Sequence, residues 1–115
     1  MKKINILKKS TDFSRIIKNT KAFVYKDYII YIERVDNSQY HFGISVSKKI
    51  GNAVVRNKIK RQIKNIIDKK DYQNNFNCII IVRKGILLKK YDDMEKEIYE
   101  AFKKLNIYKE EIDEK

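Results

Sequence analysis

The sequence predicts an α+β fold in which about three helices pack with a small sheet of three to four strands. Some segments carry apolar residues at spacings of three and four, which is typical of helices, whereas others alternate every two positions, as strands do. The chain has 115 residues, enough for one hydrophobic core. We therefore predict a single domain over residues 1–115.

The first predicted helix covers Ser10 to Asn19. Ser10 or Thr11 can supply an N-cap hydroxyl, and Asp12 places an acid in the first turn, where it favours the helix dipole. Its apolar residues recur at helical spacing: Phe13, Ile16 and Ile17.

Two strands are predicted next. Tyr28, Ile30 and Ile32 alternate with Ile29, Tyr31 and Glu33, and a shorter strand around residues 22–25 is expected before them. After a polar turn at residues 36–38, a second run alternates Tyr40, Phe42, Ile44 and Val46 with His41, Gly43, Ser45 and Ser47. We expect an antiparallel hairpin of these two strands. One face of the second strand would cover the core, and the other would leave its backbone open to a ligand.

A basic helix follows the glycine and asparagine at positions 51 and 52. Asn52 is the expected N-cap, and the helix should run to about Lys70. Its apolar stripe consists of Val55, Ile59, Ile63, Ile66 and Ile67. A helical projection places Asn57, Lys60, Arg61 and Lys64 roughly opposite that stripe, with Lys58 on the flank. Arg56 projects to the edge of the stripe, so it either extends toward solvent or meets a partner at the seam.

The last third of the chain predicts one strand and one helix. The run CIIIVR at positions 78–83 is apolar on both faces, which favours an interior strand that Gly85 ends. Asp92 or Asp93 is the expected cap of the final helix. The apolar residues of that helix are Met94, Ile98, Ala101, Phe102 and Leu105. Beyond Asn106 we expect a frayed polar tail.

The charge of the chain indicates a polyanionic partner. The net charge is +12, and residues 1–70 carry 18 Lys and Arg against 5 acids, whereas residues 71–115 carry 9 against 10. Seven cations lie between positions 48 and 64 with no acid among them, so simple solvation with Glu–Lys pairing does not describe this segment. Phosphate contacts would make binding strong and salt-sensitive. A membrane-surface role is the weaker alternative, because the apolar stripe is needed by the sheet.

Aromatic residues gather in the first half of the chain: Phe13, Tyr28, Tyr31, Tyr40 and Phe42. Phe42 and Tyr28 are in line with Ile44 and Ile30, so we expect them in the core. Tyr31 points to the opposite face, where it could stack on a base beside Phe13 or simply pack.

The sequence offers few constellations for catalysis by the protein itself. Cys78 and His41 are each alone, which excludes a disulfide framework or a Cys/His zinc site within the chain. The acids Asp92, Asp93, Glu95 and Glu97 could hold a divalent ion, although acids in a first helical turn usually serve the dipole. The start, MKKINILKK, matches neither a signal peptide nor a membrane span, so we expect a soluble cytoplasmic protein.

Two motifs resemble a known family, the protein component of bacterial ribonuclease P. They are GISVSKKIGNAVVRNKIKR at positions 43–61 and LKKSTDF at positions 7–13. The resemblance implies a mixed sheet with a left-handed crossover through the basic helix. Pattern alone would favour a right-handed crossover.

The resemblance also implies a function. Such proteins act within a ribonucleoprotein enzyme whose RNA subunit, with Mg2+ held mainly by the RNA, hydrolyses the bond that frees the 5′ leader of precursor tRNA. The protein helps to bind the leader and supports the RNA and its metals. The implied partners are therefore the catalytic RNA and precursor tRNA, with no membrane and no small-molecule substrate.

The family pattern assigns two groups of residues in this chain. The group implied to contact the catalytic RNA is Lys48, Lys49, Asn52, Arg56, Asn57, Lys58, Lys60, Arg61 and Lys64. The group implied for the leader-binding cleft is Phe13, Ile17, Tyr28, Tyr31 and Ser45, with Tyr28 and Ser45 at its margin. Lys58 stands where arginine is usual, which removes a bidentate contact but keeps the charge. Ile17 stands where an aromatic is often found.

Two alternatives stay open at the level of sequence. A ribosomal or assembly protein of the same fold would bind folded RNA but no leader. A protein-only nuclease would instead use the acids around Asp92.

Overall fold

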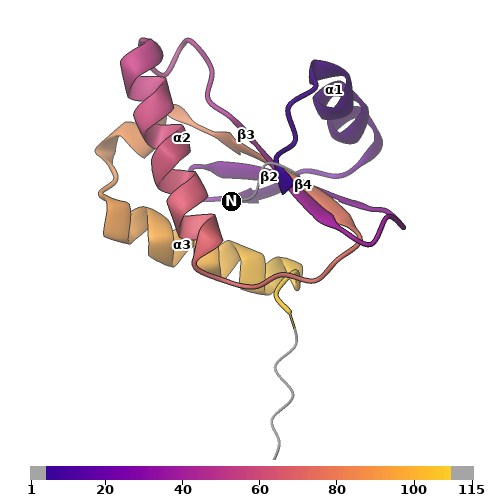
Figure 1. Cartoon of the computed structure of the whole chain (residues 1–115). Helices are drawn as coiled ribbons and strands as arrows, with labels where there is room; N and C mark the ends of the chain where they lie inside the picture. The colour runs from indigo at the N-terminus through magenta and orange to yellow at the C-terminus, as the bar shows by residue number, and fades with distance from the viewer. Residues whose placement is uncertain (1–4, 110–115) are drawn as a thin grey trace, which may run out of the picture.

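The computed structural model describes residues 5–109, which form three α-helices, a four-stranded sheet and a short 3-10 helix (Figure 1). The elements are α1 (Ser10–Asn19), β1 (Phe23–Tyr25), β2 (Tyr28–Arg34), β3 (Tyr40–Ser45), α2 (Ala53–Asp68), β4 (Phe76–Val82), η2 (Lys84–Leu88) and α3 (Tyr91–Leu105). The predicted α+β class, the three helices and the early short strand are confirmed.

The sheet order is β1-β2-β4-β3, so the predicted hairpin of β2 with β3 is wrong. Strand β4 lies between them, antiparallel to β2 and parallel to β3. Its residues are buried on both faces, apart from the half-buried Ile81. A strand with two apolar faces is most stable in the interior of a sheet, which explains why β4 displaces the hairpin. The interior position predicted for this strand is confirmed.

The loop between β2 and β3 is shaped by Asn75, which precedes β4. The backbone N–H of Val35 donates to the Asn75 carbonyl, and the Asn75 N–H donates to the Gln39 carbonyl, at 3.0 and 2.7 Å. The Asn75 side chain accepts a further bond from the Ser38 N–H at 2.7 Å. The loop is therefore held by hydrogen bonds to the residue before β4 and does not form a tight hairpin turn between β2 and β3.

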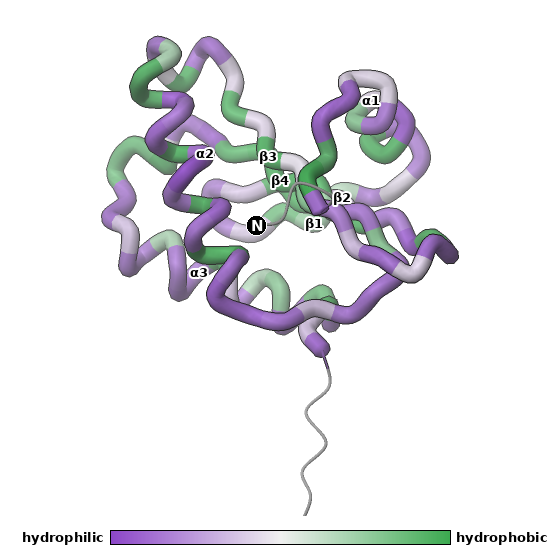
Figure 2. Tube along the Cα trace, in the orientation of Figure 1, coloured by the Kyte–Doolittle hydropathy of each residue, from purple (hydrophilic) through white to green (hydrophobic). Residues whose placement is uncertain are grey.

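The main core lies between one face of the sheet and helices α2 and α3. The buried stripe of α2 consists of Ile59, Ile63, Ile66 and Ile67, as predicted, and α3 contributes Met94, Ile98, Ala101 and Phe102. Tyr28 and Phe42 are buried on this side, which confirms their predicted place in the core. Figure 2 shows hydrophobic segments where the strands meet the helices and hydrophilic ones along the outer turns.

The N-cap predicted for α2 is confirmed, whereas the N-cap predicted for α3 is wrong. Asn52 caps α2, since its side chain accepts the Val55 N–H at 3.0 Å. Helix α3 begins two or three residues earlier than its acids suggested, with Lys90 as N-cap. Asp93 instead accepts the Lys90 N–H from inside the first turn, at 3.3 Å, so the prediction of Asp92 or Asp93 as the cap is wrong.

The segment after α3 packs back on the domain. Ile107 is buried, and Tyr108 forms an isolated antiparallel bridge with Tyr72. The expectation of fraying beyond Asn106 is therefore wrong for residues 107–109, because Ile107 supplies apolar surface to the core. The rest of that predicted tail lies outside the described residues.

Helix α1 covers the second face of the sheet, apart from α2 and α3 (Figure 1). It begins at Ser10 with Lys9 as N-cap and no side-chain cap, so the predicted hydroxyl cap is wrong. Phe13 lies directly on Gly43, which is buried: a Cβ on Gly43 would come within 2.5 Å of Phe13 Cζ. The expectation that the Gly43 backbone stays open to a ligand is therefore wrong.

We predict that Gly43→Ala destabilises the docking of α1. The added methyl group must displace the Phe13 ring, and such overpacking costs about 1–3 kcal/mol in the free energy of unfolding. Denaturant titration measures this cost. Combining Gly43→Ala with Phe13→Leu should recover part of it, and Ser45→Ala on the same face is the control. No loss in Gly43→Ala would show that Phe13 moves freely.

Candidate nucleic-acid interface

The face of the sheet that carries α1 is organised as three rows of residues across β2, β4 and β3. The pairing register defines the rows as Glu33–Asn77–His41, Tyr31–Ile79–Gly43 and Ile29–Ile81–Ser45. The first row is polar, the second is partly covered by α1, and the third has no buried member. This short helix therefore leaves a half-open surface beside it.

The polar row forms a continuous hydrogen-bonded chain with α1. Arg15 makes a two-point contact with Glu33 at 2.9 and 3.2 Å, and Asn77 donates its side-chain N–H to Glu33 at 2.8 Å. The Asn77 side-chain oxygen lies 2.8 Å from His41 Nδ1. Because the Asn77 amide nitrogen is already the donor to Glu33, its oxygen accepts, and His41 Nδ1 carries the proton. Both His41 and Asn77 border a groove at the start of α1.

The second row brings Phe13 and Tyr31 to the same face. Tyr31 and Gly43 flank the buried Ile79 on its two neighbouring strands, and Phe13 rests on Gly43. Two strand spacings separate Tyr31 from Gly43, about 10 Å. Both residues are half-buried, and Phe13 also lines a groove beside the basic helix. Ser45 and the half-buried Ile17 also lie on this side of the molecule, in the third row and on α1.

Tyr28 does not belong to this surface. Its side chain is buried on the opposite face, and its hydroxyl donates to Glu97 at 3.0 Å. Burial beside a carboxylate raises the pKa of Tyr28 well above its ordinary value. The implied place of Tyr28 at the margin of the cleft is therefore wrong. Neighbouring residues of a strand alternate between faces, so Tyr28 and Tyr31 cannot share one.

The basic helix presents most of its predicted contact residues to solvent. Those exposed are Lys48, Lys49, Asn52, Asn57, Lys58 and Arg61, and those half-buried are Arg56, Lys60 and Lys64. No ion pair joins any of these cations to an acid within the described part of the chain, whereas Arg15, Lys69 and Lys89 are all paired. Within residues 5–109, the charge of this surface is therefore not offset by ion pairing.

A groove connects the basic helix to Phe13. It has a volume of about 310 Å3, and Lys60 and Lys64 line it together with Phe13 and residues 6–8. The segment before α1 lies beside β3, where the Leu7 N–H donates to the Phe42 carbonyl at 2.9 Å. A helical projection places Lys60 and Lys64 away from the apolar stripe. In the structure, both nevertheless line this groove beside Phe13.

Arg56 is half-buried at the edge of the apolar stripe, where the helical projection places it. Its Nε is buried and has no hydrogen-bond partner among residues 5–109. A buried donor without an acceptor costs about 1–3 kcal/mol, so an external acceptor at this point would gain that energy. The seam beside the apolar stripe is therefore a potential contact point.

Comparison with known proteins decides the family. The family model described as Ribonuclease P matches residues 1–106. The chain belongs to the ribonuclease P protein family. The ribonuclease P protein component of Streptococcus pneumoniae strain CGSP14 is 39% identical over 114 residues, covering 96% of this chain and 91% of that protein.

Solved ribonuclease P proteins share the fold. The RNase P protein of Staphylococcus aureus is 29% identical with a TM-score of 0.79, and the match covers 91% of this chain and 98% of that one. The Thermotoga maritima protein is 22% identical with a TM-score of 0.77, over 85% and 94% of the two chains, and shows the likeness of fold alone. As a ribonuclease P protein, the chain binds RNA and takes part in a ribonuclease that processes tRNA.

The acids of α3 do not form the nuclease site that one alternative required. Glu95 pairs with Lys69 at 2.7 Å, and Glu97 is buried between Tyr28 and Lys89. Within residues 5–109 no three metal-ligating side chains come together. The residues that the structure describes in this ribonuclease P protein therefore do not fit a magnesium site of their own. None of its described helices combines the length and apolar character that a membrane span requires.

The polar row was not predicted from the sequence as part of a site. Arg15, Glu33, His41 and Asn77 are far apart along the chain, and the sequence pattern places His41 in a strand without assigning it to a site. The register of β4 brings them together. One signal was available: Asn77 is the polar residue of the otherwise apolar strand β4, and buried amides require partners.

We predict a pH-dependent effect of Glu33→Gln on stability. Hydrogen bonding to Arg15 lowers the pKa of Glu33 below its ordinary value of 4.5. The ionised carboxylate therefore stabilises the fold above that value, and this contribution is lost as the pH falls through the folded pKa. Glu33→Gln should unfold more easily than the wild type at pH 7, with the difference disappearing in acid. Denaturant titrations across this range, with Asp36→Asn as the control, measure the effect. A constant difference would contradict it.

Proposed function

We propose that this chain is the protein subunit of a ribonuclease P holoenzyme in which the RNA subunit, with Mg2+, removes the 5′ leader from precursor tRNA. One observation carries the proposal: Phe13 and Tyr31 lie on the same face of the sheet, and a groove lined by Phe13, Lys60 and Lys64 joins that face to a row of cations that have no acid partner among residues 5–109. Stacking platforms beside unpaired cations are the means by which proteins hold single-stranded RNA. The proposal places this assembly in the cytoplasm.

The two parts of the surface have different roles in this proposal. The half-open face beside α1 receives the single-stranded leader, with rings of Phe13 and Tyr31 against its bases. The exposed cations of α2 contact phosphates of the catalytic RNA, and the unpaired Nε of Arg56 receives an acceptor from the same RNA. The protein then increases cleavage by holding substrate and catalyst together, and the chemistry stays with the RNA and its magnesium.

The direct test mixes the protein with the catalytic RNA of the same organism at low Mg2+ and measures cleavage of a precursor tRNA. We expect faster cleavage than by the RNA alone, because the protein supplies cations and leader contacts that lower the demand for metal. Failure to increase cleavage would disprove the proposal.

Tyr31→Ala should selectively weaken binding of precursor tRNA. Loss of one stacked base costs about 1–3 kcal/mol, which is roughly a 5- to 150-fold loss of affinity. Mature tRNA, which has no leader, should bind the variant and the wild type equally. Tyr25→Ala, at a half-buried tyrosine of the opposite face, is the control. A protein that binds folded RNA but no leader would instead show no selective loss.

Arg61→Ala should lower the salt dependence of RNA binding. Each phosphate contact contributes about 0.9 to the slope of log affinity against log salt for a duplex, so the slope should decrease by about one with little dependence on sequence. Arg83→Ala, which removes an exposed arginine after β4, is the matched control. An unchanged slope in Arg61→Ala would place this residue away from phosphate.

A further inference from the structure

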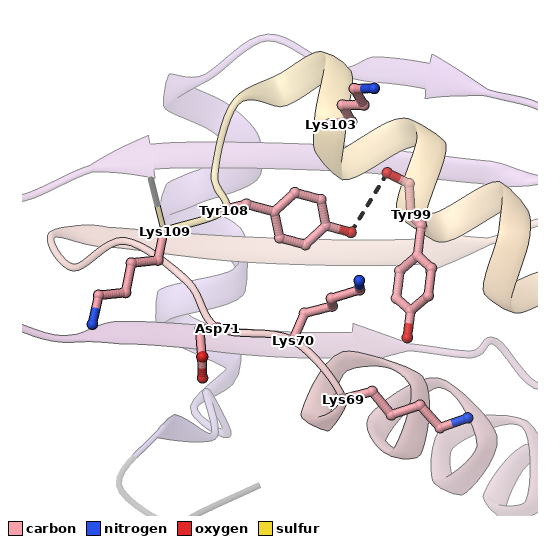
Figure 3. Close-up of a pocket in the computed structure, with 7 residues that line it drawn as sticks. All are labelled: Lys69, Lys70, Asp71, Tyr99, Lys103, Tyr108 and Lys109. Carbon is pink, nitrogen blue, oxygen red and sulfur yellow. Dashed lines mark hydrogen bonds between the residues drawn. The ribbon is translucent and has the colours of Figure 1, made fainter. Parts of the chain in front are cut away.

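A second cationic groove lies at the other end of α2 from Asn52. Its volume is about 730 Å3, within the range of about 300–1,000 Å3 that is usual for ligand sites. The lining residues are Lys69, Lys70, Asp71, Tyr99, Lys103, Tyr108 and Lys109 (Figure 3). Helix α2 has 16 residues and is therefore about 24 Å long, so this groove is well separated from the cap at Asn52.

The groove carries an excess of positive charge. Four lysines face a single acid, Asp71, and none of them forms an ion pair with it. Lys69 is neutralised by Glu95 at 2.7 Å, but Lys103 and Lys109 have no acid partner within residues 5–109. The resulting field favours an anion.

The helix dipole explains why some of these lysines lie at this place in the fold. Lys69 and Lys70 follow the C-terminal end of α2, and Lys103 lies in the last turn of α3, where cations are favourable. Lys109 lies on no helix. Its backbone N–H donates to the Asp71 carbonyl at 3.1 Å, which holds the segment after α3 against the end of α2. The tertiary contact therefore closes a groove that neither helix would form alone.

Two tyrosines give the groove firm aromatic walls. The ring of Tyr108 stacks on Tyr72, with centroids 5.6 Å apart, and its hydroxyl donates to the Tyr99 carbonyl at 3.5 Å (Figure 3). Tyr99 is half-buried, and the Lys70 ammonium lies 5.1 Å from the centre of its ring. Fixed aromatic rings beside lysines are the combination that binds single-stranded nucleic acid.

We propose that this groove binds a second, single-stranded segment of the RNA that the chain associates with. Lys103 and Lys109 contact its phosphates, and Tyr99 and Tyr108 border a base or ribose. The inference rests on the proposed function for the identity of the partner. None of the residues that line this groove belongs to the leader cleft or to the row of cations at the start of α2.

The test is a salt titration of binding to the catalytic RNA by the full chain carrying Lys103→Gln and Lys109→Gln. Each lost contact with a single strand should reduce the slope of log affinity against log salt by about 0.7, hence by about 1.4 in total. Lys84→Gln with Lys96→Gln makes the same charge change at exposed sites outside the groove and should leave the slope unchanged. Equal slopes for the groove variant and the wild type, or equal effects of both double variants, would overturn the proposal.

Cross-linking provides a second and independent measurement. Cys78 is the single cysteine of the chain, and its burial raises the pKa of its thiol. A labelling reagent should therefore react with a cysteine introduced at the exposed position 103 and not with Cys78. With a photoreactive group attached, Lys103→Cys should form an RNA adduct, at nucleotides different from those reached from Asn57→Cys, whereas Lys96→Cys should not. An adduct from position 57 but none from position 103 would overturn the proposal that this groove binds RNA and leave the proposed function intact. Adducts from neither position would count against both.

Discussion

The structure depends on the burial of β4 on both faces. A strand of this kind needs a neighbour on each side and a helical layer above and below, since unpaired backbone groups and exposed apolar faces are both unfavourable. Helices α2 and α3 cover one face, where Tyr28, Ile30, Phe42, Phe76, Cys78 and Ile80 are buried. Helix α1, with 10 residues, covers the other face only in part. The half-open surface beside α1 is therefore a consequence of the mismatch between a short helix and a wider sheet.

Polar contacts fix how α1 sits on that face. Arg15 on the helix and Glu33, Asn77 and His41 on three strands form one hydrogen-bonded chain, while Phe13 occupies the space that Gly43 leaves free. Asn77 is the buried member of this row, and a buried amide is unfavourable without partners; here its amide nitrogen donates to Glu33 and its oxygen accepts from His41. The position of Phe13 relative to Tyr31, on which leader binding would depend, thus follows from contacts within the protein.

Helix α2 carries charge at both ends, with different surroundings. Near its start the cations pair with no acid among the described residues, which favours a strong positive field at this surface. At its other end, Lys69 pairs with Glu95 of α3, and the free charge shifts to Lys103 and Lys109 on neighbouring segments. One helix therefore supports two separate cationic surfaces, which would allow a single domain to contact two segments of a long RNA.

The sequence by itself determined the elements, the apolar stripe of α2, the Asn52 cap and the interior character of β4, because these depend on local periodicity and on residue type. It also indicated an RNA partner, through the absence of acids between positions 48 and 64. The tertiary structure decided which strands pair, since β2 and β3 are neighbours in sequence but both are more stable beside β4. It also decided that Tyr28 is buried while Tyr31 is half-open, and that His41, Asn77, Glu33 and Arg15 meet. Such contacts join residues distant in sequence, and no local pattern specifies them.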